Sequence, residues 1–207
     1  TDDAGFTEGV GASTPVINPT LDVNANIVKG PVSGASCDIF AVDDSGAAVL
    51  PAQGNATSGD TGGITFTDVH IAGMGLISCT DGTYIDESTG QTLNAPALRS
   101  VVNVVEGSAE TPAPSYVVSP LTEMAVQNAL INARFGIRFD TTEVLPTSVG
   151  IVDLGADGAE NADRYGSVLA LLSQLDADNA DADISAVIEG FATDLADGSF
   201  SEESLTA

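Results

Sequence analysis

Residues 82–100 read GTYIDESTGQTLNAPALRS and contain two kinds of segment. The runs TYID and LRS, the second continuing as LRSVVNVV, combine apolar or β-branched residues with polar ones. Between them, ESTG gathers the Ser, Thr and Gly residues that are typical of turns. The stretch therefore predicts strand, turn and strand, and it places this part of the chain in a sheet.

The same alternation of short strands and turns occupies the first half of the chain. Apolar residues alternate with polar ones, as in a half-buried strand, at Leu21, Val23, Ala25 and Ile27. Further strand-like runs are CDIFAV, AAVLPA, GITFTDVHI, GLISC and SYVVS, and turn signals such as DDSG, SGDTGG and AGMG separate them. Regular short strands with such turns predict an antiparallel β-sandwich over residues 21–118.

Beyond residue 118 the apolar period changes to that of helices. Ser119 is a candidate N-cap with Pro120 at the first helical position. Three stripes follow at helical spacing: Leu121, Met124, Asn128, Ile131 and Phe135; Tyr165, Val168, Leu169, Leu172 and Leu175; and, from near Asp183, Ile184, Val187, Ile188, Phe191 and Leu195. The stripes predict a three-helix region over residues 119–207, packed on the sandwich, and so an α+β fold.

Composition limits the possible functions. The 207 residues carry 30 Asp and Glu against five basic residues, a net charge of −25, and 43% of them are apolar. That apolar share suffices for a buried core, whereas the charge repels phosphate backbones and anionic lipid. No apolar run approaches the roughly 20 residues that cross a bilayer, and the chain starts at Thr1 without a basic segment. We expect a mature or trimmed product that neither binds nucleic acid nor inserts into a membrane.

The two cysteines, Cys37 and Cys79, lie in the strand-like stretches SCDIFAV and GLISCT. No CxxC motif or cysteine–histidine cluster accompanies them, which disfavours a metal site. One disulfide between neighbouring strands of an exported protein is the simplest interpretation. Closing that loop would stabilise the fold by about 4 kcal/mol in the chain-entropy model. Two buried free thiols in a cytosolic protein are the alternative.

The succession IVKGPVSGASCDIFAV, ATSGDTGGITFTDV and GTYIDESTGQTLNAPALRSVV resembles the carboxypeptidase-regulatory-like, transthyretin-like β-sandwich of bacterial surface lipoproteins and adhesins. In those proteins, as here, a SPLTEMAV helix start and a helical pair like YGSVLALLSQL…FATDLADG follow. The resemblance covers roughly residues 24–200. Such lipoproteins usually carry a lipidated cysteine near the mature N-terminus, where this chain has Thr1.

The resemblance implies structural tasks for the opening stretch. Residues 86–90 would form a polar hairpin tip, with Gly90 at positive φ and the acidic and hydroxyl side chains bonding the turn backbone. Tyr84 and Leu98 would face the core. The resemblance implies no catalytic residues.

The sequence contains no catalytic constellation. His70 is the only histidine, and no GxSxG motif or comparable nucleophile accompanies it. Carboxylate pairs are plentiful, but a sugar-cleaving pair usually lies among aromatic residues, and this chain has no Trp and three Tyr. We therefore expect a protein that is not an enzyme, and we interpret His70 as a strand side chain.

The stretch DADNADAD, residues 176–183, is the candidate metal site. Its acids precede a helix at close spacing, and calcium prefers several hard oxygen ligands, here Asp176, Asp178, Asp181 and Asp183. The spacing does not fit an EF-hand, and the stretch serves equally as an interhelical loop whose last acid caps the next helix. Calcium is the one cofactor that the sequence suggests, and a plain loop is the alternative.

Lys29 is the only lysine and lies at the end of a predicted strand. Related sandwich folds of surface proteins can form an intramolecular bond between a lysine and an asparagine or aspartate. Because the sequence identifies no partner, we interpret Lys29 as an exposed strand lysine.

Residues 1–20 are rich in Gly, Thr, Pro and acid, and we interpret them as an extended N-terminal segment outside the core. Such a segment can add a strand to an open sheet edge of a neighbouring copy, here through its apolar residues Phe6, Val10, Val16 and Ile17. A disordered leader or linker is the alternative.

These observations favour a non-enzymatic extracellular or cell-surface protein, a subunit of a surface filament or adhesive assembly. Its partners would be copies of itself or other surface proteins. The alternative is a ligand-binding surface or periplasmic protein with a pocket between sandwich and helices, for which Asn128 and Tyr165 would supply polar groups.

Overall fold

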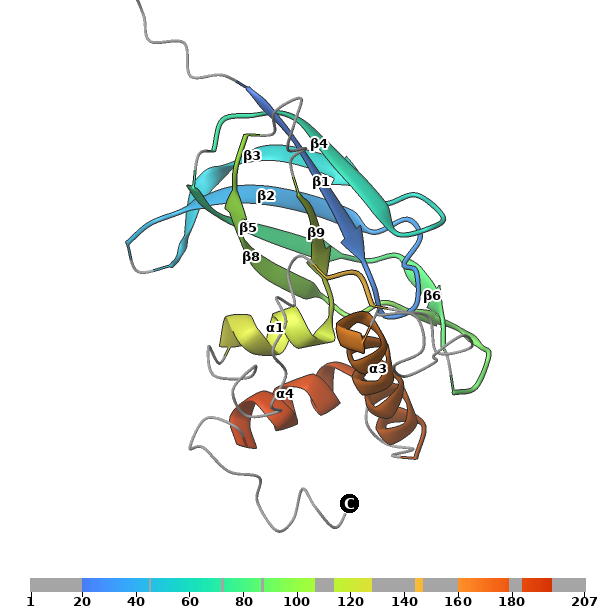
Figure 1. The fold of residues 1–207 in the computed structure, drawn as a ribbon. Helices are drawn as coiled ribbons and strands as arrows, with labels where there is room; N and C mark the ends of the chain where they lie inside the picture. Colours follow the sequence, from blue (N-terminus) through green and yellow to red (C-terminus); the bar gives the residue numbers. More distant parts are fainter. Residues whose placement is uncertain are drawn as a thin grey trace, which may run out of the picture.

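The chain is described here from a computed structural model, which covers residues 20–44, 46–71, 73–86, 88–106, 114–127, 144–146, 160–178 and 184–194. Within these ranges, nine strands come first and three helices follow (Figure 1). The fold is therefore α+β, as predicted.

The strands form two main sheets and a small hairpin. Their bounds are β1 (Leu21–Ile27), β2 (Ser36–Val42), β3 (Ala48–Thr57), β4 (Gly63–Val69), β5 (Gly73–Thr80), β6 (Thr83–Ile85), β7 (Thr92–Asn94), β8 (Leu98–Val104) and β9 (Ser115–Val118). The strand orders are β4-β1-β9 in one sheet and β3-β2-β5-β8 in the other, and β6 pairs with β7. This arrangement is sandwich-like and mostly antiparallel, whereas the transthyretin-like type stays a prediction.

Three details differ from the strands that the sequence predicts. First, β9 runs parallel to β1, and the long connection that a parallel pair requires passes through the second sheet. Second, β7 was not expected. Third, β3 continues beyond the predicted run AAVLPA, through Gly54 to Thr57, and it tolerates both Pro51 and Gly54 because it is the terminal strand of its sheet.

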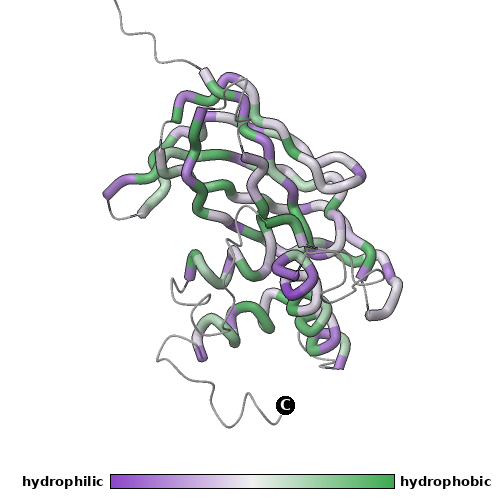
Figure 2. Tube along the Cα trace, in the orientation of Figure 1, coloured by the Kyte–Doolittle hydropathy of each residue, from purple (hydrophilic) through white to green (hydrophobic). Residues whose placement is uncertain are grey.

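The core lies between the two sheets. Along β1 the side chains of Val23, Ala25 and Ile27 are buried while those of Asp22 and Asn24 are exposed, which is the alternation that a pleated strand imposes. The opposite sheet contributes, among others, Cys37, Ile39, Ile77, Leu98 and Val102. Each fully buried Val, Leu or Ile side chain among them stabilises the fold by about 1.5–3 kcal/mol. Figure 2 shows the resulting alternation of hydrophobic and hydrophilic residues along the strands.

The helices are α1 (Pro120–Gln127), α3 (Glu160–Asp178) and α4 (Ile184–Asp194), and they lie together at one end of the sheets (Figure 1). Ser119 caps α1 as predicted: its backbone N–H donates to Thr122 Oγ1 at 2.8 Å, and its Oγ accepts from the Thr122 N–H at 3.3 Å. None of the described helices is long and apolar enough to cross a membrane. The predicted stripe residues Asn128, Ile131, Phe135 and Leu195 lie outside the described ranges.

Hydrogen bonds join two of the helices to the strands. Thr122 Oγ1 on α1 lies 2.8 Å from the carbonyl oxygen of Arg99 on β8, and the hydroxyls of Ser119 and Tyr165 share a hydrogen bond that holds α3 beside the end of β9. Whether the helical region as a whole depends on the sandwich stays a prediction.

Candidate functional site: a buried lysine where strands and helix meet

Lys29 is fully buried, so its interpretation as an exposed strand lysine is wrong. It follows β1 in a turn with Gly30, whose φ is +70°. A Cβ on Gly30 would stand 2.9 Å from the carbonyl oxygen of Ile85, so only glycine lets this turn approach β6 so closely. The approach places Lys29 Nζ 4.9 Å from the centroid of the Tyr84 ring, in cation–π contact.

The second charged group of the site is Asp86, directly after β6. Its side chain is 2% exposed, and Oδ2 lies 3.7 Å from Lys29 Nζ. Oδ1 accepts hydrogen bonds from the Ser88 N–H at 3.1 Å, the Ser88 hydroxyl at 2.6 Å, the Thr89 N–H at 2.8 Å and the Thr89 hydroxyl at 2.9 Å. No hydrogen bond from the described residues reaches Oδ2. The two carboxylate oxygens therefore have different surroundings.

The hairpin tip is otherwise the turn that the resemblance implies. Gly90 has a φ of +69°, and its N–H donates to the carbonyl oxygen of Asp86 at 2.8 Å. Tyr84 and Leu98 are buried, as expected. The tip is not wholly exposed, however, because the Asp86 side chain is buried and pairs with Lys29, the only lysine of the sequence.

The carboxyl of Asp86 is held in its charged form. Burial would raise its pKa, but the hydrogen bonds from Ser88 and Thr89, together with the positive charge of Lys29, outweigh burial and lower the pKa below its ordinary value. Lys29 and Asp86 thus form a buried ion pair.

Helix α3 completes the site through Ser173. Lys29 Nζ donates a hydrogen bond to Ser173 Oγ, and this hydroxyl in turn donates to the carbonyl oxygen of Leu169 at 3.2 Å. Ser88 Oγ lies 3.4 Å from the carbonyl oxygen of Ser173. The end of β1, the hairpin tip and α3 therefore meet at one ammonium group. The sequence offered one signal for this site, a single lysine in a chain with 30 acids.

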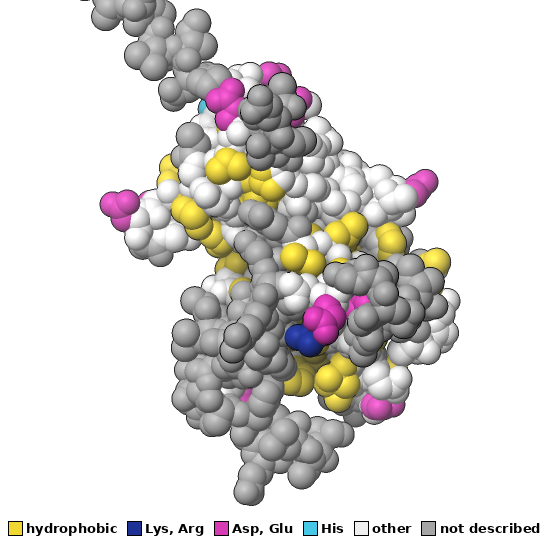
Figure 3. All heavy atoms as spheres, viewed as in Figure 1, with side chains coloured by type: hydrophobic (Ala, Val, Ile, Leu, Met, Phe, Trp, Pro, Cys, Tyr) yellow, Lys and Arg dark blue, Asp and Glu magenta, His cyan; other side chains and the backbone are white. Residues whose placement is uncertain are grey.

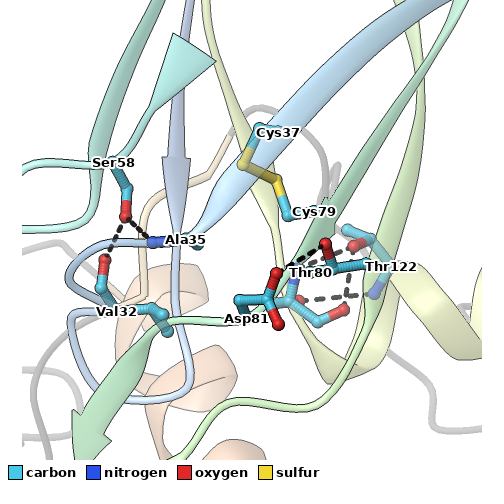
Figure 4. Close-up of a disulfide and its surroundings, with 9 residues drawn as sticks. Val32, Ala35, Cys37, Ser58, Cys79, Thr80, Asp81 and Thr122 are labelled. Carbon is cyan, nitrogen blue, oxygen red and sulfur yellow. Dashed lines mark hydrogen bonds between the residues drawn. A yellow bond between two sulfur atoms is a disulfide. The ribbon is translucent and has the colours of Figure 1, made fainter. Parts of the chain in front are cut away.

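The predicted disulfide is present. Cys37 on β2 and Cys79 on β5 are directly opposed in the antiparallel register, and their sulfurs are bonded (Figure 4). Both residues are buried. Beside them, Ser58 Oγ donates to the Val32 carbonyl at 2.8 Å and accepts from the Ala35 N–H at 2.9 Å, which holds the β1–β2 connection against the end of β3.

The calcium ligands are only partly covered by the structure. Asp176 and Asp178 lie in the last turn of α3, where Gln174 Nε2 donates to Asp178 Oδ1 at 2.9 Å. Asp181 and Asp183 lie outside the described residues. Within the described ranges, no three or more His, Cys, Asp or Glu side chains are grouped so that they could hold a metal ion. The calcium site stays a prediction.

The residues expected in an assembly contact, Phe6, Val10, Val16 and Ile17, also lie outside the described ranges, as does Asn128 of the expected ligand pocket. Tyr165, the other expected pocket residue, is fully buried, and its hydroxyl bonds to Ser119. A surface groove is found elsewhere, between the β5–β6 turn and the segment after β7; its lining includes Ser33, Asp81, Thr83 and Asn94.

On the face seen in Figure 3, the acidic side chains of the described residues occur at several separate places and do not form one continuous patch. His70 is exposed one residue beyond β4, not within the strand. The strongest chemical feature of the described chain is thus the buried pair of Lys29 and Asp86, an amine and a carboxyl held in contact.

Comparison of the chain with family models, with curated proteins and with solved structures found no match.

Proposed function

We propose that this chain is a non-enzymatic extracellular structural protein, a subunit of a surface filament or adhesive assembly. In this proposal, the N-terminal segment of one copy adds a strand to an exposed sheet edge of the next. Partners are copies of the chain or other surface proteins.

The observation that carries the proposal is the first part of β3. This strand ends the order of its sheet, and all four residues from Ala48 to Pro51 are exposed. Val49 is 43% and Leu50 is 78% exposed, so an edge with unpaired backbone groups also offers apolar side chains. Natural proteins usually protect such edges with charges or covers, because they pair readily with other strands.

The N-terminal segment, as the donor strand, and the β3 edge, as the acceptor strand, can pair only over a short length. Pro15 and Pro19 confine a pairing donor strand to about residues 6–18, and Pro51 confines the acceptor to residues 48–50, because proline has no N–H for a ladder. Phe6, Val10, Val16 and Ile17 supply the apolar side chains of the donor. A short added strand suits reversible assembly better than a permanent dimer.

Two further features support an extracellular place for the protein. A buried disulfide persists in oxidising compartments and is rare in the cytosol. A net charge of −25 keeps individual copies apart at low ionic strength, and salt relieves that repulsion. Assembly outside the cell, where salt and divalent cations are available, fits both.

The test compares the full chain with a version that starts at Leu21, by light scattering and negative-stain microscopy, with and without added salt and calcium. Full-length protein should assemble in salt, and the shortened version should stay monomeric. Leu50→Glu should abolish assembly of the full chain. Met74→Glu is the matched control, because Met74 is an exposed apolar residue, 51% accessible, on the interior strand β5.

If the full-length and shortened versions assemble equally, or if both stay monomeric, the segment is not the connector. A ligand-binding surface or periplasmic protein then becomes the better proposal. The ligand pocket would then have to form without the Tyr165 hydroxyl, because that hydroxyl is hydrogen-bonded to Ser119.

A further inference from the structure

We propose that Lys29 and Asp86 condense into an intramolecular amide bond, which ties the end of β1 covalently to the hairpin tip that follows β6. The proposal concerns the folded single chain and holds whether or not copies assemble. The buried ion pair described above is the reactant state.

The placement of the two groups favours bond formation. Lys29 Nζ and Asp86 Oδ2 are 3.7 Å apart, and the two side chains are 0% and 2% exposed. Two groups held at this distance react at an effective concentration far above any that free molecules reach.

The reaction balances without any other reactant. The Lys29 ammonium gives one proton to Oδ2 of Asp86, and the lone pair of the neutral Nζ then attacks Cγ. The Nζ–Cγ bond forms, a second proton passes from Nζ to the same oxygen, and the Cγ–Oδ2 bond breaks. One water molecule leaves, and an ammonium and a carboxylate have become one neutral amide.

The different surroundings of the two carboxylate oxygens suit this step. Oδ1, which accepts from Ser88 and Thr89, remains as the amide oxygen, and its donors stabilise the negative charge that develops there during attack. Oδ2, which no hydrogen bond from the described residues holds, is the leaving oxygen. The Ser173 hydroxyl already accepts from Nζ, so it can carry the second proton.

Burial also favours the product. Two opposite charges away from water carry a desolvation penalty that their attraction only partly offsets. An amide has no net charge and keeps the oxygen that is already hydrogen-bonded. Release of water from a closed site further opposes the reverse reaction.

Trypsin provides a direct test, because Lys29 is the only tryptic site before Arg99. A lysine whose Nζ is in an amide bond is not cleaved. Full-length protein, folded, then denatured and reduced, should therefore give a fragment 1–99 that is about 18 Da lighter than its sequence. The disulfide cannot mimic this result, because both of its cysteines lie in the fragment 30–99.

Three variants complete the test. Lys29→Arg keeps the tryptic site but cannot condense, because the guanidinium stays protonated, so it should give fragments 1–29 and 30–99. Asp86→Ala should also be cleaved at Lys29. Asp81→Asn is the matched control, because Asp81 is an exposed acid just before β6, and this variant should keep the uncleaved, lighter fragment.

Tandem mass spectrometry of the uncleaved fragment should find a branch that joins residues 29 and 86. Cleavage of the wild-type chain at Lys29 overturns the proposal. It does so even if the chain has lost one water, because a succinimide at an Asp-Gly pair causes the same mass loss but leaves Lys29 cleavable. The digestions use denatured chains, so poor folding of a variant does not affect the result for the wild type.

Discussion

Glu123 on α1 binds the guanidinium of Arg99 on β8 with both carboxylate oxygens. Arg99 Nε lies 3.2 Å and 3.0 Å from Oε1 and Oε2, and Nη2 lies 2.5 Å from Oε1. The hydrogen bonding to Glu123 raises the pKa of Arg99. The Glu123 side chain is 7% exposed, so this bidentate pair fastens the first helix to the last strand of the larger sheet.

Removing the arginine should weaken this joint. Arg99→Ala is expected to lower the free energy of unfolding by about 1–3 kcal/mol, because a buried carboxylate loses its charged donor. Arg164→Ala is the matched control, since Arg164 pairs with Glu160 at 3.4 Å on an exposed helix face. The control substitution should lower the free energy of unfolding by at most about 0.5 kcal/mol. Urea unfolding measures both, and equal losses would show that the Arg99 pair is worth no more than a surface pair.

The disulfide leads to a second prediction. Alkylation of the denatured protein without prior reduction should add no mass, because Cys37 and Cys79 are bonded. Replacing both cysteines by serine should lower the free energy of unfolding by about 4 kcal/mol, the entropy of the loop that the bond closes. Two alkylated thiols in unreduced protein would rule the bond out.

Two glycines at positive φ should differ in their tolerance of a side chain. Gly62 has a φ of +80°, and a Cβ there would stand 2.4 Å from the carbonyl oxygen of Ile27. Gly90 has a φ of +69°, and a Cβ there meets nothing within 4 Å. Gly90→Ala should therefore cost only the left-handed backbone strain, about 1–2 kcal/mol.

Gly62→Ala carries the same strain and must also displace β1 backbone, which should add roughly 1–3 kcal/mol. Thermal unfolding of the two variants compares them directly. A Gly62→Ala protein as stable as the Gly90→Ala protein would mean that the turn before β4 shifts freely away from β1.

The helical region should not be stable alone. Helix α1 has 8 residues and α4 has 11, and isolated helices of such length are marginal in water. Residues 119–207 expressed alone should therefore give weak helical circular dichroism without a cooperative melt. A strongly helical, cooperative melt would show that the region folds without the sandwich.

Local patterns in the sequence were sufficient for most of the secondary structure. The alternation from Leu21 to Ile27 indicates a half-buried strand, and Ser119 with Pro120 marks the start of α1, because side-chain period and capping are properties of neighbouring residues. The disulfide could also be predicted, since the chain contains only two cysteines and both lie in strand-like runs.

Contacts between distant segments could not be predicted in this way. The parallel pairing of β1 with β9 depends on where the chain returns after the second sheet. The spacing of apolar residues within a strand contains no information about that return. Lys29 was expected at the surface because lysine alone is costly to bury. Its burial depends on Asp86, Tyr84 and Ser173, which the fold brings together from β6, the hairpin tip and α3. A charge can leave water only where such partners surround it, and that arrangement exists only in the folded chain.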